Sequence, residues 1–273
     1  MTTAAITGIT GLAGRHVATT LQALGHEVIG ISRRPPNDWA DADIRSVPDL
    51  TDAGALTTAL RGCDVIFHFA DRADRKSYTE GNIGAAAKVL SAIRSAAARN
   101  GISRIVAASS IYAELSDRPA DLYGRSKRAM EAVGMAAAPG SPAAILRLPP
   151  LYGPGARGAV RHIARAIEQG WPLPFGLARA PRRFLSLDEL ADLCNHLATI
   201  NQTTFDRAVG RILVPVSAES DSLFALCRAI GQGNERLLPV PGIDRIIGGR
   251  ITPDQLDSHR ETLAEAVGWR AQE

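Results

Sequence analysis

The first half of the chain alternates short apolar runs with segments in which apolar residues recur at helical spacing. The candidate strands are Ala4–Thr7, Glu27–Ser32, Val65–Phe69, Ile105–Ser109 and Ala144–Leu148, with a weaker one near Ile44–Val47. The candidate helices between them are Gly14–Ala23, Asp52–Leu60, Gly84–Asn100 and Tyr123–Ala137. This alternation predicts a parallel sheet with helices on both faces, so that ligands would bind at the carboxyl ends of the strands.

The pattern changes after Leu148, where prolines separate shorter segments. The elements expected there are helices at Gly158–Gln169, Asp188–Thr199, Ser222–Ile230 and Pro253–Val267, and a strand at Ile212–Val216. We therefore predict an α/β fold, with a Rossmann-type doubly wound parallel sheet in residues 1–155 and a returning segment near residues 184–200. Residues 156–273 would form most of a smaller C-terminal substrate-binding domain.

Composition narrows the class of protein. The 273 residues are 45% hydrophobic and 22% charged, which is enough for a sizeable core. No apolar run approaches the roughly 18 residues of a spanning helix, so no membrane segment is predicted. The first candidate strand begins at Ala4, which leaves no room for a signal peptide, and we expect a cytoplasmic protein.

Charge and cysteine spacing exclude further classes. The formal net charge is +3, and aromatic residues make up 5% of the chain. A nucleic-acid-binding protein would need a clustered basic surface with stacking aromatic residues, so no nucleic-acid partner is predicted. Cys63, Cys194 and Cys227 are far apart and show no CxxC spacing. Neither a metal site nor a disulfide framework is therefore predicted.

A glycine-rich turn, TGITGLAG at Thr7–Gly14, joins the first strand to the first helix. Glycine at positions 8, 11 and 14 permits a tight turn and a close backbone approach, and the helix N-terminus offers unpaired amides to a pyrophosphate. A glycine triplet between a strand and a helix is typical of dinucleotide sites. The candidate cofactor residues of this turn are Gly8, Thr10, Gly11, Leu12, Ala13 and Gly14.

The end of the second strand bears on which dinucleotide binds. NAD sites usually have an Asp or Glu there, whereas this chain has Ser32, Arg33 and Arg34. Hydroxyl and guanidinium groups suit the extra phosphate of NADP(H), which is therefore favoured over NAD(H). The alternative interpretation is that both arginines are solvated loop residues.

A second motif, YGRSK at Tyr123–Lys127, places a phenol and an ammonium on one helical face. An ammonium beside a phenol favours the phenolate, so the phenol could exchange a proton with a substrate oxygen. Ser109 and Ser110 end a central strand, where a hydroxyl could hold the same oxygen. The two motifs together indicate a nicotinamide-dependent enzyme with Tyr123 as its acid or base.

TGxxGxxG, the serine pair and YxxxK together resemble the extended short-chain dehydrogenase/reductase family, which includes nucleotide-sugar epimerases, dehydratases and 4-ketoreductases. The resemblance extends over nearly the whole chain and implies Tyr123, Lys127 and Ser110, or alternatively Ser109, as catalytic residues. It implies further cofactor contacts at Asp49, Leu50, Phe69, Ala70 and Pro150, in addition to Tyr123 and Lys127. It also implies that Ser110 and Arg182 contact the substrate. A homodimer is a further implication of the resemblance.

Three functions follow as hypotheses. The first is NADP(H)-dependent reduction of a carbonyl carbon, in particular the C4 carbonyl of a nucleotide-linked sugar. The second is C4 epimerisation of a UDP-sugar with NAD, against which the missing acidic residue after Ile31 argues. The third is a non-catalytic NADP-binding sensor, which would have little use for Tyr123 and Lys127. Arg157, Arg161 and Arg165 share one helical face, for which a solvated surface is the favoured interpretation.

Overall fold

The computed structural model describes residues 1–34, 43–72, 75–115, 121–137 and 140–271. The chain divides into two compact units, here termed the first unit and the second unit. The first unit comprises Met1–Arg147 and Ala191–Leu213, and the second comprises Leu148–Leu190 and Val214–Glu273. The sequence pattern places the first boundary at residue 155 and the returning segment near 184–200.

The first unit contains a seven-stranded parallel sheet with the order β10-β6-β5-β4-β1-β2-β3. Its strands are β1 (Thr3–Thr7), β2 (Glu27–Ser32), β3 (Asp43–Ser46), β4 (Val65–His68), β5 (Arg104–Ser110), β6 (Ala144–Leu148) and β10 (Ile212–Leu213). The Rossmann-type doubly wound sheet expected from the alternating pattern is confirmed. The chain order reverses between β1 and β4, where open α/β sheets bind ligands.

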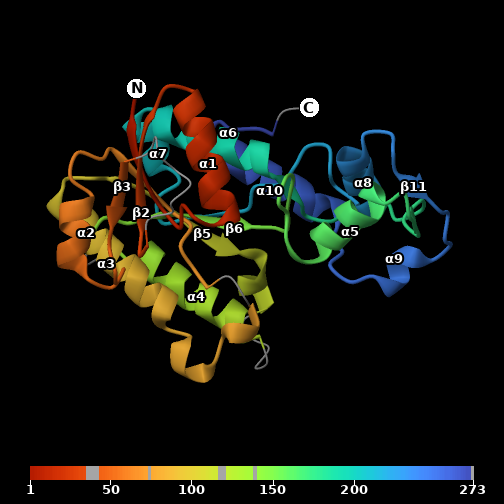
Figure 1. Cartoon of the computed structure of the whole chain (residues 1–273), viewed down its shortest axis with the longest axis horizontal. Helices are drawn as coiled ribbons and strands as arrows, with labels where there is room; N and C mark the ends of the chain where they lie inside the picture. Colours follow the sequence, from red (N-terminus) through yellow and green to blue (C-terminus); the bar gives the residue numbers. More distant parts are fainter. Residues whose placement is uncertain (35–42, 73–74, 116–120, 138–139, 272–273) are drawn as a thin grey trace. The chain divides into compact units, whose positions relative to one another are not determined.

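Helices cover both faces of this sheet (Figure 1). One face carries α2 (Ala53–Ala59), α3 (Ala85–Arg99) and α4 (Leu122–Met135), and the other carries α1 (Leu12–Ala23), most of α6 (Leu187–Thr199) and α7 (Gln202–Asp206). The side chains of Asp52 and Asp121 cap the first turns of α2 and α4 by accepting backbone N–H bonds. The predicted helices of this unit were therefore correct to within a few residues, whereas α7 was not predicted.

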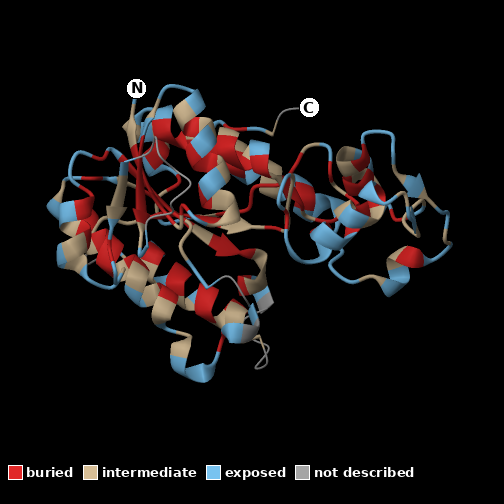
Figure 2. Cartoon of the chain, viewed as in Figure 1, coloured by how far each residue is buried: buried red, intermediate tan, exposed pale blue. Residues whose placement is uncertain are grey.

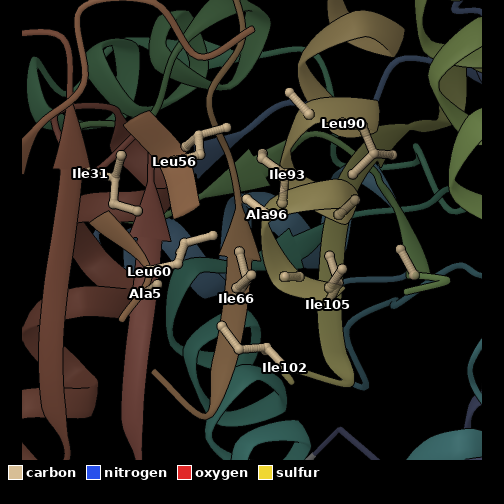
Figure 3. Close-up of a cluster of buried hydrophobic side chains, with 14 of the residues drawn as sticks. Ala5, Ile31, Leu56, Leu60, Ile66, Leu90, Ile93, Ala96, Ile102 and Ile105 are labelled. Carbon is tan, nitrogen blue, oxygen red and sulfur yellow. The ribbon is translucent and has the colours of Figure 1, made fainter. Parts of the chain in front are cut away.

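One hydrophobic core of the first unit lies between the sheet and the face formed by α2, α3 and α4 (Figure 3), and α1, α6 and α7 bury further apolar side chains. The strands are buried along most of their length (Figure 2), as expected where helices cover both faces. The residues of this core include Ile31, Leu56, Ile66, Leu90, Ile93 and Ile105. This packed layer supports the carboxyl ends of the strands.

The second unit has short strands and a smaller core. Two parallel two-stranded sheets pair β7 (Leu151–Tyr152) with β9 (Leu185–Ser186), and β8 (Pro172–Leu173) with β11 (Arg236–Leu237). Its remaining helices are α5 (Gly158–Glu168), α8 (Leu223–Gly231), α9 (Ile243–Ile246) and α10 (Pro253–Val267). The core of this unit centres on Val160, Ile163, Phe184, Leu226 and Cys227.

Two findings concern the whole described chain. Cys63, Cys194 and Cys227 are all buried free thiols. In the described ranges, no helix combines the length and the apolar character that crossing a bilayer requires.

Candidate active site

The glycine turn lies where the strand order reverses, between β1 and β4. Gly8 has a φ of +75°, and a Cβ there would lie 2.6 Å from the Ala70 nitrogen, just after β4. A Cβ on Gly14 would lie 2.4 Å from the Gly8 carbonyl oxygen, so both positions require glycine. Gly11 is the N-cap of α1 and makes no side-chain cap bond. The first amides of α1, at Leu12 and Ala13, can therefore serve a pyrophosphate.

A cavity of about 550 Å³ lies at the end of β2. Its lining brings together five residues from three segments, namely Thr10, Ser32, Arg33, Arg34 and Pro48. Two arginines line this cavity, and no carboxylate is found among its described lining residues. The Ser32 hydroxyl donates to the Arg34 carbonyl at 2.8 Å, which holds the two residues in a tight turn. The donor set suits a phosphate group.

A second cavity, of about 390 Å³, has both polar and apolar walls. Asp49, Leu50 and Ala70 line it, together with Ala86 and Val89 of α3. The N–H and hydroxyl groups of Thr51 donate to the Asp49 carboxylate at 2.8 Å each and hold the pKa of Asp49 below its usual value. An ionised acceptor above apolar side chains suits an adenine ring, which has an exocyclic amino donor. The chain's residues thus fit a dinucleotide at the glycine turn and in both cavities.

Lys127 connects α4 to the carboxyl ends of two strands. Its ammonium donates to the Ala108 carbonyl of β5 at 2.9 Å and lies 2.6 Å from Asp71 Oδ2, just after β4. Tyr123 lies one helical turn earlier on the same face, and the Lys127 nitrogen is 6.0 Å from the centre of its ring. The structure therefore brings the YxxxK pair to the strand ends at which the glycine turn lies.

Aromatic rings surround Tyr123. The Tyr78 ring is edge-on to it at 5.2 Å, and the Tyr112 ring is edge-on at 6.0 Å. Tyr112 belongs to a 3₁₀ helix, η3 (Ile111–Leu115), which approaches α4 closely because residue 124 is glycine. A Cβ on Gly124 would lie 2.3 Å from the Tyr112 carbonyl oxygen. Arg75 lies 3.7 Å above the Tyr112 ring and adds a cation to this side of the site.

The two candidate serines have different partners. The Ser109 hydroxyl donates to Glu131 Oε1 at 2.6 Å, and Glu131 is fully buried in a two-bond pair with Arg147. Among the described residues, the Ser110 oxygen accepts one long bond of 3.3 Å, from the Tyr112 N–H. Ser110 thus keeps a hydroxyl proton for another acceptor, whereas that of Ser109 is committed to the interior.

Two further predicted residues lie in the second unit, Pro150 and Arg182. The Pro150 carbonyl accepts a backbone bond from Leu185. Arg182 is 4% exposed, and its guanidinium donates to Asp244 and to the carbonyls of Ile247 and Gly248. A substrate phosphate at Arg182 would therefore have to replace bonds within this unit.

The second unit also holds a cavity of about 940 Å³ beside α5. Arg157, Arg161 and Arg165 line it, with Tyr152 on β7 and Asp188 at the start of α6. All three arginines are exposed, in line with the solvated face favoured from sequence, and they also border a hollow large enough for a sizeable ligand.

Sequence reasoning did not identify Asp71, Tyr78 or Glu131. For Glu131 a signal was available, because Tyr123, Lys127 and Glu131 follow one another at intervals of four residues on one helical face. For Asp71 the signal was a carboxylate directly after the mostly apolar run VIFHFA, at the edge where parallel strands present ligand contacts.

A family model described as "NAD dependent epimerase/dehydratase family" matches residues 4–206. The chain belongs to this family. The resemblance inferred from the motifs is thereby confirmed, and members of this extended short-chain dehydrogenase/reductase type are NAD(P)-dependent epimerases, dehydratases or reductases.

Individual relatives match in part. The chain is 25% identical to a UDP-glucose 4-epimerase of Vibrio cholerae over 69% of its own length and 64% of the relative's. It is 33% identical to a ceramide reductase of Caulobacter vibrioides, over 55% of the chain and 47% of the relative. An uncharacterized protein of Mycobacterium tuberculosis is 38% identical over 39% of the chain, which amounts to 12% of that protein.

Solved structures share the fold at low identity. The UDP-N-acetylglucosamine 4-epimerase from Bacillus cereus superposes with a TM-score of 0.69 at 19% identity, over 100% of this chain and 92% of that one. The Bordetella bronchiseptica enzyme WbmG, solved with NAD and UDP, has a TM-score of 0.67 at 20% identity, over 99% and 89%. At these identities the likeness concerns the fold.

Proposed function

We propose that the protein is an NADP(H)-dependent reductase of a carbonyl carbon, acting on a 4-keto sugar linked to a nucleotide. The observation that carries this proposal is the phosphate-suited cavity at the end of β2, lined by Ser32, Arg33 and Arg34. A cofactor phosphate there would be held by two guanidinium groups, which favours NADP(H) over NAD(H). A reductase oxidises one reduced cofactor in each turnover, and NADPH is suited to serve as that reductant.

Ser110 at the end of β5 and the α4 residues Tyr123 and Lys127 have separate tasks in this reaction. When bound, the cofactor supplies a hydride to the carbonyl carbon, so the C=O bond becomes an alkoxide. Tyr123 gives its phenolic proton to that oxygen, and Ser110 donates a hydrogen bond to it. Lys127 holds a ribose hydroxyl and stabilises the tyrosinate that remains.

The substrate class is supported by the second unit. Its arginine-lined cavity offers Arg157, Arg161 and Arg165 to an anionic ligand, and its volume suits a nucleotide sugar. UDP occurs in the structure of WbmG, and nucleotide-sugar epimerases are found among both the relatives and the solved neighbours. Arg182 is a further candidate for a phosphate contact, provided that its internal bonds open.

A second candidate function is C4 epimerisation with a retained NAD. The similarity to the Vibrio cholerae epimerase favours it, and it requires the same tyrosine, lysine and serine. The two functions differ at the end of β2, because an NAD enzyme gains nothing from a cavity lined by two arginines. The third hypothesis, a non-catalytic sensor, gains no support from the contacts of Lys127 with Asp71 and Ala108, because a sensor would not need them.

The deciding experiment is to denature the purified protein, identify any released dinucleotide, and titrate the emptied protein with NADPH and NADH. We expect the variant Arg33→Ser/Arg34→Ser to raise the Kd for NADPH by about 10-fold to 100-fold, because two charged hydrogen bonds are lost. The Kd for NADH should change by less than about twofold, since the 2′-phosphate is then absent.

The matched control is Arg99→Ser/Arg207→Ser, which removes the same charge from two exposed positions of the first unit. It should leave both Kd values unchanged. Tightly retained NAD, or equal effects of the Arg33→Ser/Arg34→Ser variant on both cofactors, would overturn the reductase proposal in favour of the epimerase. A homodimer and a cytoplasmic location remain expectations from the sequence, and light scattering would test the first.

A further inference from the structure

The Asp71 carboxylate bridges two side chains of the candidate active site. Its Oδ2 atom lies 2.6 Å from the Lys127 nitrogen, and its Oδ1 atom accepts a 2.5 Å hydrogen bond from the Tyr78 hydroxyl. The Asp71 side chain is 18% exposed and the Lys127 side chain 6% exposed, so solvent screens their attraction only weakly. The bridge therefore determines where the ammonium lies.

Counting donors shows what the bridge leaves available. A lysine ammonium has three N–H groups. Among the described residues, Asp71 and the Ala108 carbonyl take two of them, and both acceptors lie at the carboxyl ends of neighbouring parallel strands. One N–H remains for a ligand hydroxyl, on an ammonium that is anchored at two points.

The bridge also distinguishes the two tyrosines of the site. Tyr78 is buried, and burial followed by the Asp71 charge raises the pKa of its phenol far above the usual value. Burial alone would raise the pKa of Asp71, but the Lys127 ammonium and the hydrogen bonds outweigh it, so Asp71 stays ionised. Tyr78 thus remains a hydrogen-bond donor to Asp71, while Tyr123 shares the helical face of Lys127.

We propose that Asp71 is a positioning residue for the nicotinamide half of the cofactor: it anchors Lys127 so that one ammonium N–H is presented to a ribose hydroxyl. Tyr78 supports this role by fixing the carboxylate. The role rests on the proposed function, because it requires a bound nicotinamide dinucleotide. The ion pair is neutral as a whole, so the carboxylate can lie near an anionic cofactor without repelling it.

The variant Asp71→Asn tests this role, because positioning and simple electrostatics predict opposite results. Loss of a negative charge near an anionic cofactor would by itself tighten NADPH binding. Loss of the anchor would weaken it, and we expect the Kd for NADPH to rise by about 10-fold. The truncated ligand 2′,5′-ADP lacks the nicotinamide half. Because Asp71 also lines the cavity assigned to adenine, the Kd of this ligand is the baseline, and it should rise several-fold less than that of NADPH.

The measurement is calorimetric titration of the whole chain with each ligand, together with melting temperatures. Asp43→Asn is the matched control, because it removes a carboxylate from an exposed ion pair with Arg45 in the same unit. It should change neither Kd. Tyr78→Phe keeps the Asp71 charge and removes only its support, so NADPH binding should weaken by about threefold.

Each outcome decides the question. An unchanged or lower Kd for NADPH in Asp71→Asn, or equal losses for both ligands, would overturn the positioning role. If that variant does not fold, an unaltered Kd for NADPH in Tyr78→Phe would overturn it instead. A parent protein that binds neither ligand would overturn the proposed function itself, and the role of Asp71 with it.

Discussion

The Lys127–Asp71 pair of the first unit and the Arg182–Asp244 pair of the second unit join a long cation to a carboxylate in different ways. Lys127 shares its ammonium between Asp71 and one carbonyl, which leaves one N–H without a partner in the described part of the chain. Arg182 donates to Asp244 and to two carbonyls of the segment that follows α9. Asp244 in turn accepts the backbone N–H groups of Arg179 and Ala180. The second pair therefore ties the segment around Arg182 to α9 and the residues just after it, within one unit.

The Lys127 ammonium is positioned to bind a ligand, whereas the Arg182 guanidinium stabilises the fold of its own unit. A regular sheet supports the strand ends from below, so the first unit can hold a cation there with a donor unsatisfied. The second unit has two-residue strands and a small core, and cross-links between loops do more of the structural work. Variants at the two sites should consequently affect different properties, either activity or stability.

The largest effect is expected for Tyr123→Phe. The variant removes a proton donor that the fold does not need, so kcat should fall by about 1,000-fold, equivalent to about 4 kcal/mol. The melting temperature and the Kd for NADPH should remain unchanged. Steady-state kinetics of a carbonyl substrate would measure the first, and calorimetry the others. Full activity in this variant would show that Tyr123 is not the acid, whereas absence of turnover in the parent protein would revive the sensor hypothesis.

The next effect is expected for Arg182→Met. An apolar side chain of similar length leaves Asp244 and two carbonyls without their partner, so the free energy of unfolding should drop by about 3 kcal/mol. Arg245→Met is the control, because that arginine is exposed on the same helix, α9. Urea unfolding compares the two variants. If Arg182→Met leaves stability intact and instead raises KM for substrate, the arginine serves the ligand rather than the fold.

A smaller effect concerns pH and His68, at the end of β4. Burial, followed by the nearby Lys127 charge, lowers the pKa of His68 to about 4, from about 6.5 in an unfolded chain. The unfolded state therefore binds the proton more tightly than the folded state does. The neutral His68 stabilises the folded state fully above pH 6.5, and this contribution declines as the pH falls toward 4. Between pH 7 and pH 5 the loss should be about 2 kcal/mol.

His68→Asn cannot titrate, but it can still bond to the Thr7 hydroxyl that lies 2.7 Å from His68 Nδ1. Between pH 7 and pH 5 the free energy of unfolding of this variant should fall by about 2 kcal/mol less than that of the parent protein, as measured by urea unfolding. Identical pH dependence in the two proteins would mean that other groups control acid stability.

The smallest effects distinguish the serines. Ser110→Ala should lower kcat by about 10-fold, through loss of one hydrogen bond to the developing alkoxide, with no loss of stability. Ser109→Ala removes the bond to the buried Glu131, so it should lower the unfolding free energy by about 1.5 kcal/mol and leave kcat nearly intact. Reversed results would make Ser109 the catalytic residue.

Much of the first unit could be predicted from sequence because its signals are local. Strands of four to seven residues alternating with helices of seven to fifteen give a clear period. Strands of two residues, such as β8 and β11, have no period to detect. The predicted strand at Ile212–Val216 shrinks to β10 for a related reason, since only Ile212 and Leu213 find a partner, on β6.

The contacts of the candidate site also divide into those that local sequence predicts and those that it does not. Tyr123 and Lys127 are four residues apart on one helix, so their proximity follows from helix geometry alone. Asp71 meets Lys127 only because β4 and β5 are neighbours in the sheet, and Asp244 lies 62 residues from Arg182. Contacts of this kind depend on tertiary topology, which no local pattern encodes. A sequence motif could therefore suggest a ligand contact for Arg182 but could not reveal the partner inside its own unit.

The three buried cysteines provide a built-in measure of how each part of the molecule opens. Burial raises the pKa of Cys63 to about 11 and that of Cys227 to about 12, and it raises that of Cys194 as well. A thiol-modifying reagent needs both access and a thiolate, so the folded chain should react slowly at every one of them. Cys63 and Cys194 belong to the first unit and Cys227 to the second. Alkylation rates followed by peptide mass spectrometry would thus measure how often each unit opens, without any cysteine having to be engineered into the chain.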